Sequence, residues 1–289
     1  MSDSILIVDA GGTSTKWCLS DHDASACKEI TTGGINAVVT SSETIRVELQ
    51  KAEELLLAAR RIYFYGAGCA SEVHKERIRR ELMHFSCKAA EIKIESDLLA
   101  AARALFGKGD GIACILGTGS NCGRYLQGRI ESHVRPLGYI LGDEGGGAHM
   151  GKEFLKRMLR GRISDSDLIE DFNVSVGMSY AELIDKVYNQ SSPNHFLASM
   201  MLLIARHIKS RDIQDIVDVC LNQFFNNCVS GLSSGGMRNV GFIGSIAKIF
   251  VANLQILCDT HGLNLLAVES SPMKGLLSYH LNTRSEYEK

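Results

Sequence analysis

Apolar and polar positions alternate in the first twenty residues, and this period of two predicts paired β-strands. Residues 5–10 form an apolar run that contains Asp9, and residues 14–20 place β-branched, aromatic and aliphatic side chains on one parity and polar ones on the other. Two glycines separate the runs. A P-loop or a dinucleotide fingerprint would open a helix directly after its glycines. The stretch therefore predicts a strand–turn–strand hairpin whose tip offers backbone amides and hydroxyl groups.

The pattern continues as a mixture of strands and amphipathic helices up to a glycine-rich break at residues 107–111. Strands are predicted at 27–32, 61–65 and 90–95, and helices at 42–60, 71–85 and 96–106. The order of elements is βββαβαβα.

After the break the order begins again. Residues 112–126 read as strand, glycine turn and strand, and 128–134 as a third strand; 239–250 and 264–277 are each a strand that runs into a helix. The segment between residues 145 and 234 has mostly helical patterns and is interpreted as an insertion. We therefore predict an α/β protein in which one unit is used twice. The domains are 1–110 and 111–289, with a helical insertion at about 150–235.

The two glycine hairpins of such a repeat are expected to face each other across a cleft between the domains. Small residues let the backbone approach phosphates closely, and main-chain N–H groups with threonine hydroxyls supply donors. Whether the last helix, about 273–285, packs back on the N-terminal domain is left open.

Composition narrows the classes of partner. The chain has 289 residues, is 45% hydrophobic and 22% charged, and its formal net charge of -2 favours neither nucleic acid nor an anionic membrane. No apolar segment approaches the roughly 18 residues of a membrane span. The start of the chain lacks a basic, apolar leader, so a cytoplasmic location is expected.

The nine cysteines offer neither a C-x-x-C pair nor an even count. Most lie inside apolar patterns, which favours reduced, buried thiols. The histidines show no metal-binding spacing, so no zinc site is predicted.

Four motifs resemble those of the actin-like ATPase and sugar kinase superfamily: DAGGT (9–13), LGTGSN (116–121), GFIGS (241–245) and SPMKG (271–275). They match its two phosphate loops, its adenosine loop and its second connecting segment. GTGSNC (117–122), GDEG (142–145) and GGIN (33–36) resemble N-acetylglucosamine kinases of the BadF/BadG/BcrA/BcrD ATPase family, as does an aspartate that opens the helix after the fifth strand. The resemblance covers nearly the whole chain and is weakest from about 155 to 235.

The resemblance implies two RNase H-like domains and transfer of the γ-phosphoryl group of MgATP to the 6-hydroxyl of N-acetylglucosamine or a related amino sugar. Asp97 would accept the proton of the attacking hydroxyl, and Asp9 would hold Mg²⁺ through water. Phosphates and adenosine would be bound by Gly11, Gly12, Thr13, Thr118, Gly119, Gly244 and Ser245. The sugar contacts would be Asn36, Ser120, Asn121 and Asp143. A homodimer is left open.

Several of these residues also fit purely structural roles. Asp97 at a helix start is a favourable charge at the positive helix end, and that position predicts a lowered pKa. Asn36 could be an ordinary turn residue, and GDEGGG could be an acidic turn without function. His149 could simply lie on the face of a helix. GGAHMGKE lacks the preceding strand and the hydroxyl residue of a Walker motif, so it is not interpreted as one.

Two other functions stay open at this stage. One is a kinase for N-acetylmuramic acid or glucosamine, a choice that residues 136–140 are expected to influence. The other is a BadF-type ATPase that activates a radical dehydratase through an iron–sulfur cluster. Such activators carry a Cys-Ala-Ala-Gly-Thr-Gly segment, and the chain has ACILGTGS there, with Cys122 in the hairpin. A sugar-binding module without catalysis is disfavoured because both aspartates and both threonines occur together.

Overall fold

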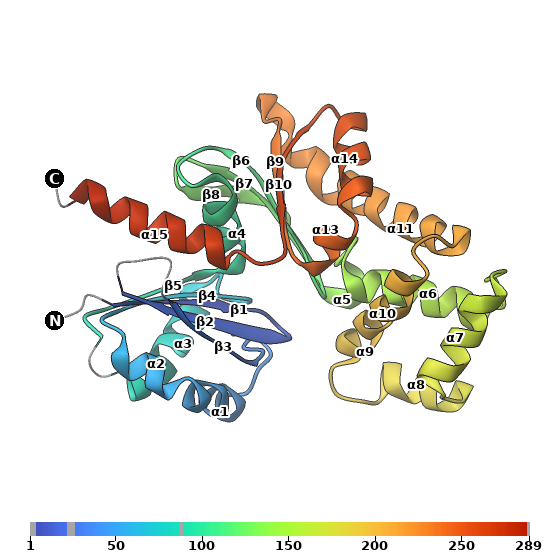
Figure 1. Ribbon diagram of the computed structural model, residues 1–289, viewed down its shortest axis with the longest axis horizontal. Helices are drawn as coiled ribbons and strands as arrows, with labels where there is room; N and C mark the ends of the chain where they lie inside the picture. Colours follow the sequence, from blue (N-terminus) through green and yellow to red (C-terminus); the bar gives the residue numbers. More distant parts are fainter. Residues whose placement is uncertain (1–3, 22–26, 87–88, 288–289) are drawn as a thin grey trace. The chain divides into compact units, whose positions relative to one another are not determined.

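The computed structural model describes residues 4–21, 27–86 and 89–287, with side chains described up to residue 281. The chain divides into two compact units (Figure 1). Unit 1 comprises Met1–Asp110, Tyr125–Ile130 and Ser271–Lys289, and unit 2 comprises Gly111–Arg124 and Glu131–Ser270.

Unit 1 is built on a five-stranded sheet. Its strands lie in the order β3-β2-β1-β4-β5, with β1–β2 and β2–β3 antiparallel and β1–β4 and β4–β5 parallel. They are β1 (Ile5–Ala10), β2 (Ser14–Ser20), β3 (Cys27–Gly33), β4 (Arg61–Gly66) and β5 (Glu91–Ser96). The helices are α1 (Ser42–Lys51), α2 (Glu53–Ala58), α3 (Glu72–Phe85), α4 (Asp97–Phe106) and α15 (Met273–Tyr287).

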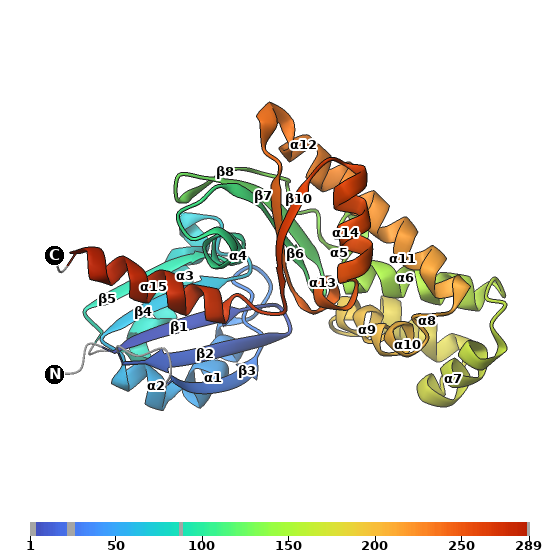
Figure 2. The same ribbon diagram turned by 45° about the horizontal axis from the view of Figure 1, so that its top comes forward.

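Helices cover both faces of this sheet (Figure 2), as the alternation along β1 requires. Leu6 and Val8 pack in one core cluster with residues of α1, α2 and α3. Ile5 and Ile7 point the other way and pack with residues of α4 and α15. The result is a three-layer α/β/α unit in which β1 is buried on both sides.

A hydrogen-bonded aromatic cluster fixes α15 on unit 1. The Tyr65 hydroxyl accepts from Arg103 Nη1 at 2.8 Å and lies 2.8 Å from His280 Nε2, while the His280 ring stacks on Tyr63 at 3.9 Å. Burial, with the charges of nearby cations, lowers the pKa of His280 to about 3. The neutral ring can therefore accept a hydrogen bond from the Tyr65 hydroxyl.

Unit 2 repeats the same sheet. The order β10-β9-β6-β7-β8, read from β8, is third, second, first, fourth and fifth strand, as in unit 1. The strands are β6 (Gly111–Leu116), β7 (Ser120–Leu126), β8 (Arg129–His133), β9 (Asn239–Ile243) and β10 (Asn264–Glu269). This repetition confirms the predicted fold of two RNase H-like units.

Helices fill most of the chain between β8 and β10. They are α5 (Gly138–Leu141), α6 (Gly147–Leu159), α7 (Ser166–Val176), α8 (Tyr180–Tyr188), α9 (Pro193–Ser199), α10 (Met201–Arg206), α11 (Arg211–Phe224), a π-helix (Phe225–Val229), α12 (Ser230–Leu232), a 3₁₀ turn (Ser234–Gly236), α13 (Ser245–Ile249) and α14 (Val251–Thr260). Side-chain caps start two of them: Asp165 caps α7, and a capping box of Ser179 and Glu182 starts α8. Together with the strands they enclose one core cluster that contains the Phe224, Phe225 and Phe242 rings.

The predicted helix at 42–60 is wrong in one respect, because it is two helices. The Ala52 N–H donates to the Leu49 carbonyl at 3.0 Å, an i→i+3 bond that tightens the turn, and Ala52 has φ −101° and ψ 8°. The chain restarts as the short α2, which keeps Leu55 and Leu56 buried in the core. Periodicity alone does not reveal such a break, because both halves keep apolar residues on one face.

Candidate active site

The first glycine turn is a tight hairpin tip between β1 and β2. The Gly11 N–H donates to the Ser14 carbonyl at 2.9 Å, which leaves Gly12 and Thr13 as an exposed tip. Pairing of Ala10 with Thr15 places this tip at the end of the sheet where the parallel strands finish. The predicted phosphate loop is therefore a tight turn in which residues 12 and 13 are exposed.

A second loop supports this tip from within unit 1. A Cβ on Gly34 would lie 2.2 Å from the Gly12 carbonyl oxygen, so only glycine permits the observed approach. Two residues later, Asn36 forms an isolated bridge with Ala67, whose N–H donates to Ala10 at 2.8 Å. The structure thus brings Asn36 to the same end of the sheet as the first turn.

The Asn36 side chain already serves its own loop. Its Oδ1 accepts from the Val38 N–H at 2.9 Å, and its backbone N–H donates to Thr40 Oγ1 at 3.0 Å. No acceptor for its Nδ2 lies among the residues that the structure describes. Asn36 is therefore a turn residue that still has two amide hydrogens to offer a ligand.

Asp9 and Asp97 lie at the carboxyl ends of parallel strands in unit 1. The registers align Ala10 of β1 with Gly66 of β4, and Gly66 with Ser96 of β5. Asp97 follows Ser96 directly and opens α4, whose N-cap is the Ser96 side chain. Two strand spacings, roughly 10 Å, separate β1 from β5, so their side chains can reach toward a common point.

The pKa of each of these two carboxyl groups is raised to about 6. Burial is the largest cause in both. Hydrogen bonds, including one from the Leu98 N–H at 2.8 Å, oppose it at Asp97, while the charge of Asp9 adds to it. The lowered pKa expected for Asp97 from its place at a helix start is therefore wrong, because loss of water outweighs the helix dipole and the local hydrogen bonds.

Unit 2 joins the second glycine turn to the GDEG segment. The Gly147 N–H donates to Gly117 and the Ala148 N–H to Thr118, both at 2.8 Å. Ser120 N–H donates to Asp143 Oδ1 at 3.3 Å, and a Cβ on Gly119 would lie 2.7 Å from Asp143 Oδ2. Four predicted residues, Thr118, Gly119, Ser120 and Asp143, are thereby held in one cluster.

Asp143 has a backbone conformation that is uncommon for residues other than glycine. Its φ of 55° is in the left-handed region, which costs energy for a residue other than glycine. Burial raises the pKa of its carboxyl group, the nearby Glu144 adds to this, and the Ser120 N–H and Lys152 oppose it. The next turn is held by His149, which is buried rather than on an open helix face and whose Nδ1 accepts from Gly145 N–H at 3.2 Å.

The predicted adenosine residues adjoin the second turn. Gly244 has φ 129°, and a Cβ there would lie 2.1 Å from the Leu116 carbonyl oxygen. Ser245 is exposed at the start of α13. On the other side of the turn, the Asn121 Oδ1 accepts from the Cys122 N–H at 2.9 Å, so this side chain is partly engaged by its own strand.

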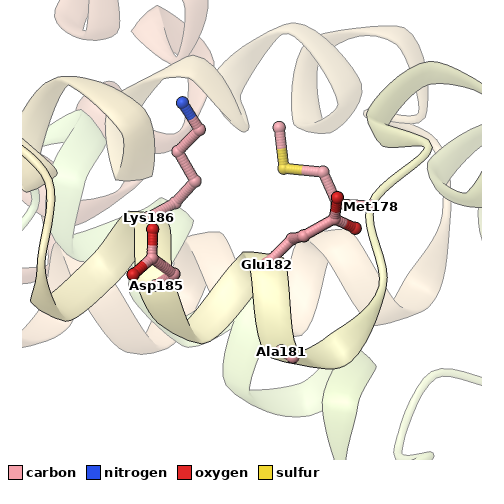
Figure 3. Close-up of a pocket in the computed structure, with 5 residues that line it drawn as sticks. All are labelled: Met178, Ala181, Glu182, Asp185 and Lys186. Atoms are coloured by element: carbon pink, nitrogen blue, oxygen red, sulfur yellow. The ribbon is translucent and has the colours of Figure 1, made fainter.

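A pocket of about 350 Å³ lies elsewhere in unit 2, along α8 (Figure 3). Met178, Ala181, Glu182, Asp185 and Lys186 line it. Figure 3 shows the Lys186 and Met178 side chains rising on either side of an open space. None of the predicted site residues belongs to it.

Sequence reasoning missed Lys16, which faces Asp9. The β1–β2 register pairs the two residues, and the Lys16 charge is the force that opposes the raised pKa of Asp9. Counting outward from the Gly12–Thr13 tip would have found the pair. Sequence reasoning also missed Asn227 of the π-helix, which donates to Glu144 Oε1 at 3.1 Å; no local signal links these positions.

Cys114 and Cys122 face the interior of unit 2. Both are fully buried, and their sulfur atoms are 3.2 Å apart. An iron–sulfur cluster shared across a dimer would need thiols at the surface. The buried positions of Cys114 and Cys122 therefore disfavour the alternative function of a dehydratase activator. The eight cysteines in the described part of the chain are all free thiols.

Comparison with known proteins shows which family the chain belongs to. No protein-family model matches it. The crystal structure of a proposed N-acetylglucosamine kinase from Porphyromonas gingivalis is 34% identical, with a TM-score of 0.88, over 97% of this chain and 99% of that one. The chain belongs to this kinase family. A curated relative, the N-acetylmuramic acid/N-acetylglucosamine kinase of Clostridium acetobutylicum, is 24% identical over 88% of each chain.

Membership of the family makes the protein an ATP-dependent carbohydrate kinase. The wider fold is that of the actin-like ATPases: MreB 5 of Spiroplasma citri covers all of this chain with a TM-score of 0.56 at 11% identity. Within the described part of the chain, helices are all too short or too polar to cross a bilayer.

Proposed function

We propose that this kinase transfers the γ-phosphoryl group of ATP to the 6-hydroxyl of N-acetylglucosamine. The observation that carries the proposal is the pair Asp9 and Asp97, two partly buried carboxyl groups beside an exposed glycine turn in unit 1. Phosphoryl transfer needs positioning and charge neutralisation more than covalent chemistry, and these residues offer both.

Each glycine turn offers groups that would bind phosphate. In unit 1 these are the amides of Gly11 and Gly12 with the Thr13 hydroxyl, and in unit 2 they are Thr118 and Gly119. The exposed tip at residues 12–13 and the glycine-only contacts of the second turn support this role. Gly244 and Ser245, at the start of α13 beside that turn, would contact adenosine.

The residues present fit a magnesium ion. Carboxylate oxygens are its preferred protein ligands. Lys16 at Asp9 and local hydrogen bonds at Asp97 oppose the effect of burial only in part, so a divalent cation nearby would lower the raised pKa values of both groups. Asp9 would hold the ion through water, and the ion would neutralise charge on the phosphates.

Asp97 orients the acceptor hydroxyl and takes its proton. With a pKa of about 6 the group is largely ionised at neutral pH, yet it is a stronger base than an ordinary aspartate. The Leu98 N–H donates to Oδ1 at 2.8 Å and so helps to fix the orientation of the carboxylate. The raised pKa thus suits proton acceptance as well as orientation.

The sugar is held by polar groups from loops that are fixed by their own hydrogen bonds. Asn36 offers its Nδ2, and Asp143, Ser120 and Asn121 offer acceptors and donors from the second turn and the GDEG segment. The positive φ of Asp143 supports this assignment, because strained backbone persists where a side chain must be aimed.

The test is an ADP-release assay with N-acetylglucosamine, N-acetylmuramic acid, glucosamine and glucose side by side. N-acetylglucosamine should give the highest kcat/KM. A higher value with N-acetylmuramic acid would move the assignment to the other substrate of the Clostridium relative.

Asp97→Asn should lower kcat by about 10²–10⁴-fold, the usual contribution of a general base, while ATP binding is retained. Asp167→Asn is the matched control, because Asp167 also lies in the first turn of a helix but is exposed. Wild-type turnover by the Asp97 variant would contradict the assigned role.

A further inference from the structure

Two thiols and a carboxylate meet on one face of the unit 1 sheet, away from the residues assigned to catalysis. Cys18 lies on β2, and Cys27 and Glu29 lie on β3. The register pairs Cys18 with Glu29 and Ser20 with Cys27, so the strand alternation puts all three on the same face. That face packs on α4 and α15, since Cys18 and Cys27 join the cluster of Ile7, Ala100 and Leu277.

The spacing of the three groups suits one small ion. Their ligand atoms all lie within 4.8 Å of one another, and Cys27 Sγ is 3.5 Å from Glu29 Oε1. Bonds of about 2.0–2.3 Å in a tetrahedral zinc site place neighbouring ligands roughly 3.3–3.8 Å apart. Small side-chain adjustments therefore bring all three onto a common centre.

We propose that Cys18, Cys27 and Glu29 form a binding site for Zn²⁺ or a similarly thiophilic divalent ion. Thiolates select such ions over Mg²⁺, which prefers oxygen. Two thiolates and one carboxylate exceed the charge of Zn²⁺ by one, and Glu29 keeps the residual charge near water because it is exposed. A solvent molecule takes the fourth position.

Binding replaces protons at the sulfur atoms. Cys18 is fully buried, and burial together with Cys27 and Glu29 keeps the pKa of its thiol above the usual range in the ion-free protein. Each thiol that becomes a ligand therefore releases its proton to solvent as the sulfur–metal bond forms. No electron is transferred in this step.

The site would be structural. β3 is the edge strand of the sheet, and a bound ion would tie it to β2 beneath α15. Because the ion binds the folded state only, a hundredfold excess over Kd should raise Tm by roughly 5–10 °C.

The experiment uses the full chain, reduced and freed of metal with a chelator. Co²⁺ is added as a spectroscopic probe and should bind at one equivalent per chain, giving a thiolate-to-metal charge-transfer band and the visible bands of a tetrahedral ion. Zn²⁺ should displace it, and X-ray absorption should show sulfur at about 2.3 Å. Mg²⁺ should neither displace Co²⁺ nor weaken the charge-transfer band.

Cys27→Ser should abolish the charge-transfer band, and Glu29→Gln should weaken Co²⁺ binding at least tenfold. Both side chains are at least partly exposed, so these variants are expected to fold. Cys258→Ser, which removes a buried thiol of unit 2, is the matched control and should bind like the wild type. Unchanged binding in Cys27→Ser, no binding by the reduced wild type, or a Cys18–Cys27 disulfide in freshly purified protein would each overturn the proposal. None of these readouts depends on kinase activity.

Discussion

At the scale of single residues, burial sets the chemistry of the candidate site more than position along an element does. Asp97 begins a helix, where a carboxylate is normally favoured, yet its pKa is raised to about 6. The helix dipole contributes up to about 1 kcal/mol at such a position, less than the cost of removing the charge from water here. A site that is ready to accept a proton is therefore also a site that costs stability.

Asp97→Asn should stabilise the protein at pH 8. A folded-state pKa of about 6, above the ordinary aspartate value of about 3.9, means that the native protein holds the proton more tightly than the unfolded chain does. The contribution of Asp97 to the free energy of unfolding therefore increases as the pH falls through 6, and it reaches its full value below about pH 4. At pH 8 the neutral variant avoids a cost of roughly 1–2 kcal/mol, reduced from the full shift because the side chain is only partly buried.

The measurement is urea denaturation of wild type and variant between pH 4 and pH 8. The stabilising effect should shrink as the pH is lowered and vanish near pH 4. Asp167→Asn should show no such gain, because its carboxylate is exposed. A destabilised Asp97 variant at pH 8 would mean that hydrogen bonds, not burial, dominate at this position.

At the scale of elements, sequence patterns predicted the strands and turns well but missed contacts that depend on register. The hairpin at residues 5–20 follows from period two and two glycines, and its register follows from the two-residue tip. The metal-binding group went unnoticed because Cys18 and Cys27 are nine residues apart, a spacing that means nothing until β2 and β3 are paired. The approach of residue 34 to the first turn is equally invisible before folding.

Gly34→Ala should impair ATP use. The added Cβ would lie 2.2 Å from the Gly12 carbonyl oxygen and 2.7 Å from the Thr13 nitrogen, so the turn must move. A displacement of about 1 Å near the reacting groups can cost on the order of 10²-fold in rate. We expect a higher KM for ATP and a lower kcat in steady-state kinetics.

Gly231→Ala is the matched control for this change, because an added Cβ there meets nothing within 4 Å and the residue lies in α12. Its kinetics should equal those of the wild type. A folded Gly34 variant with wild-type kinetics would show that the turn does not need the observed support.

At the scale of the whole molecule, the order of elements predicted the duplication of the unit. For the insertion, the sequence predicted helices but not how they are arranged. Both sheets share one strand order, which the repeated strand–turn–strand signal predicts. The insertion gave no such signal. No local motif marks the break into a π-helix at Phe225, which carries Asn227 to Glu144 and places the Phe225 ring against Phe242.

Each unit has its own hydrophobic core, so the ligand-free protein should unfold in two calorimetric transitions. Leu49→Ala, which opens a cavity in the unit 1 core, should lower only one of them and so assign it. If residues of both units bind the same ligands, N-acetylglucosamine with an ATP analogue that cannot transfer its γ-phosphate should raise both transitions and merge them. Adenosine is the matched control, since without phosphates it should engage only Gly244 and Ser245 and raise the unit 2 transition alone. A ternary mixture that raised a single transition would contradict the proposal that both glycine turns bind phosphate.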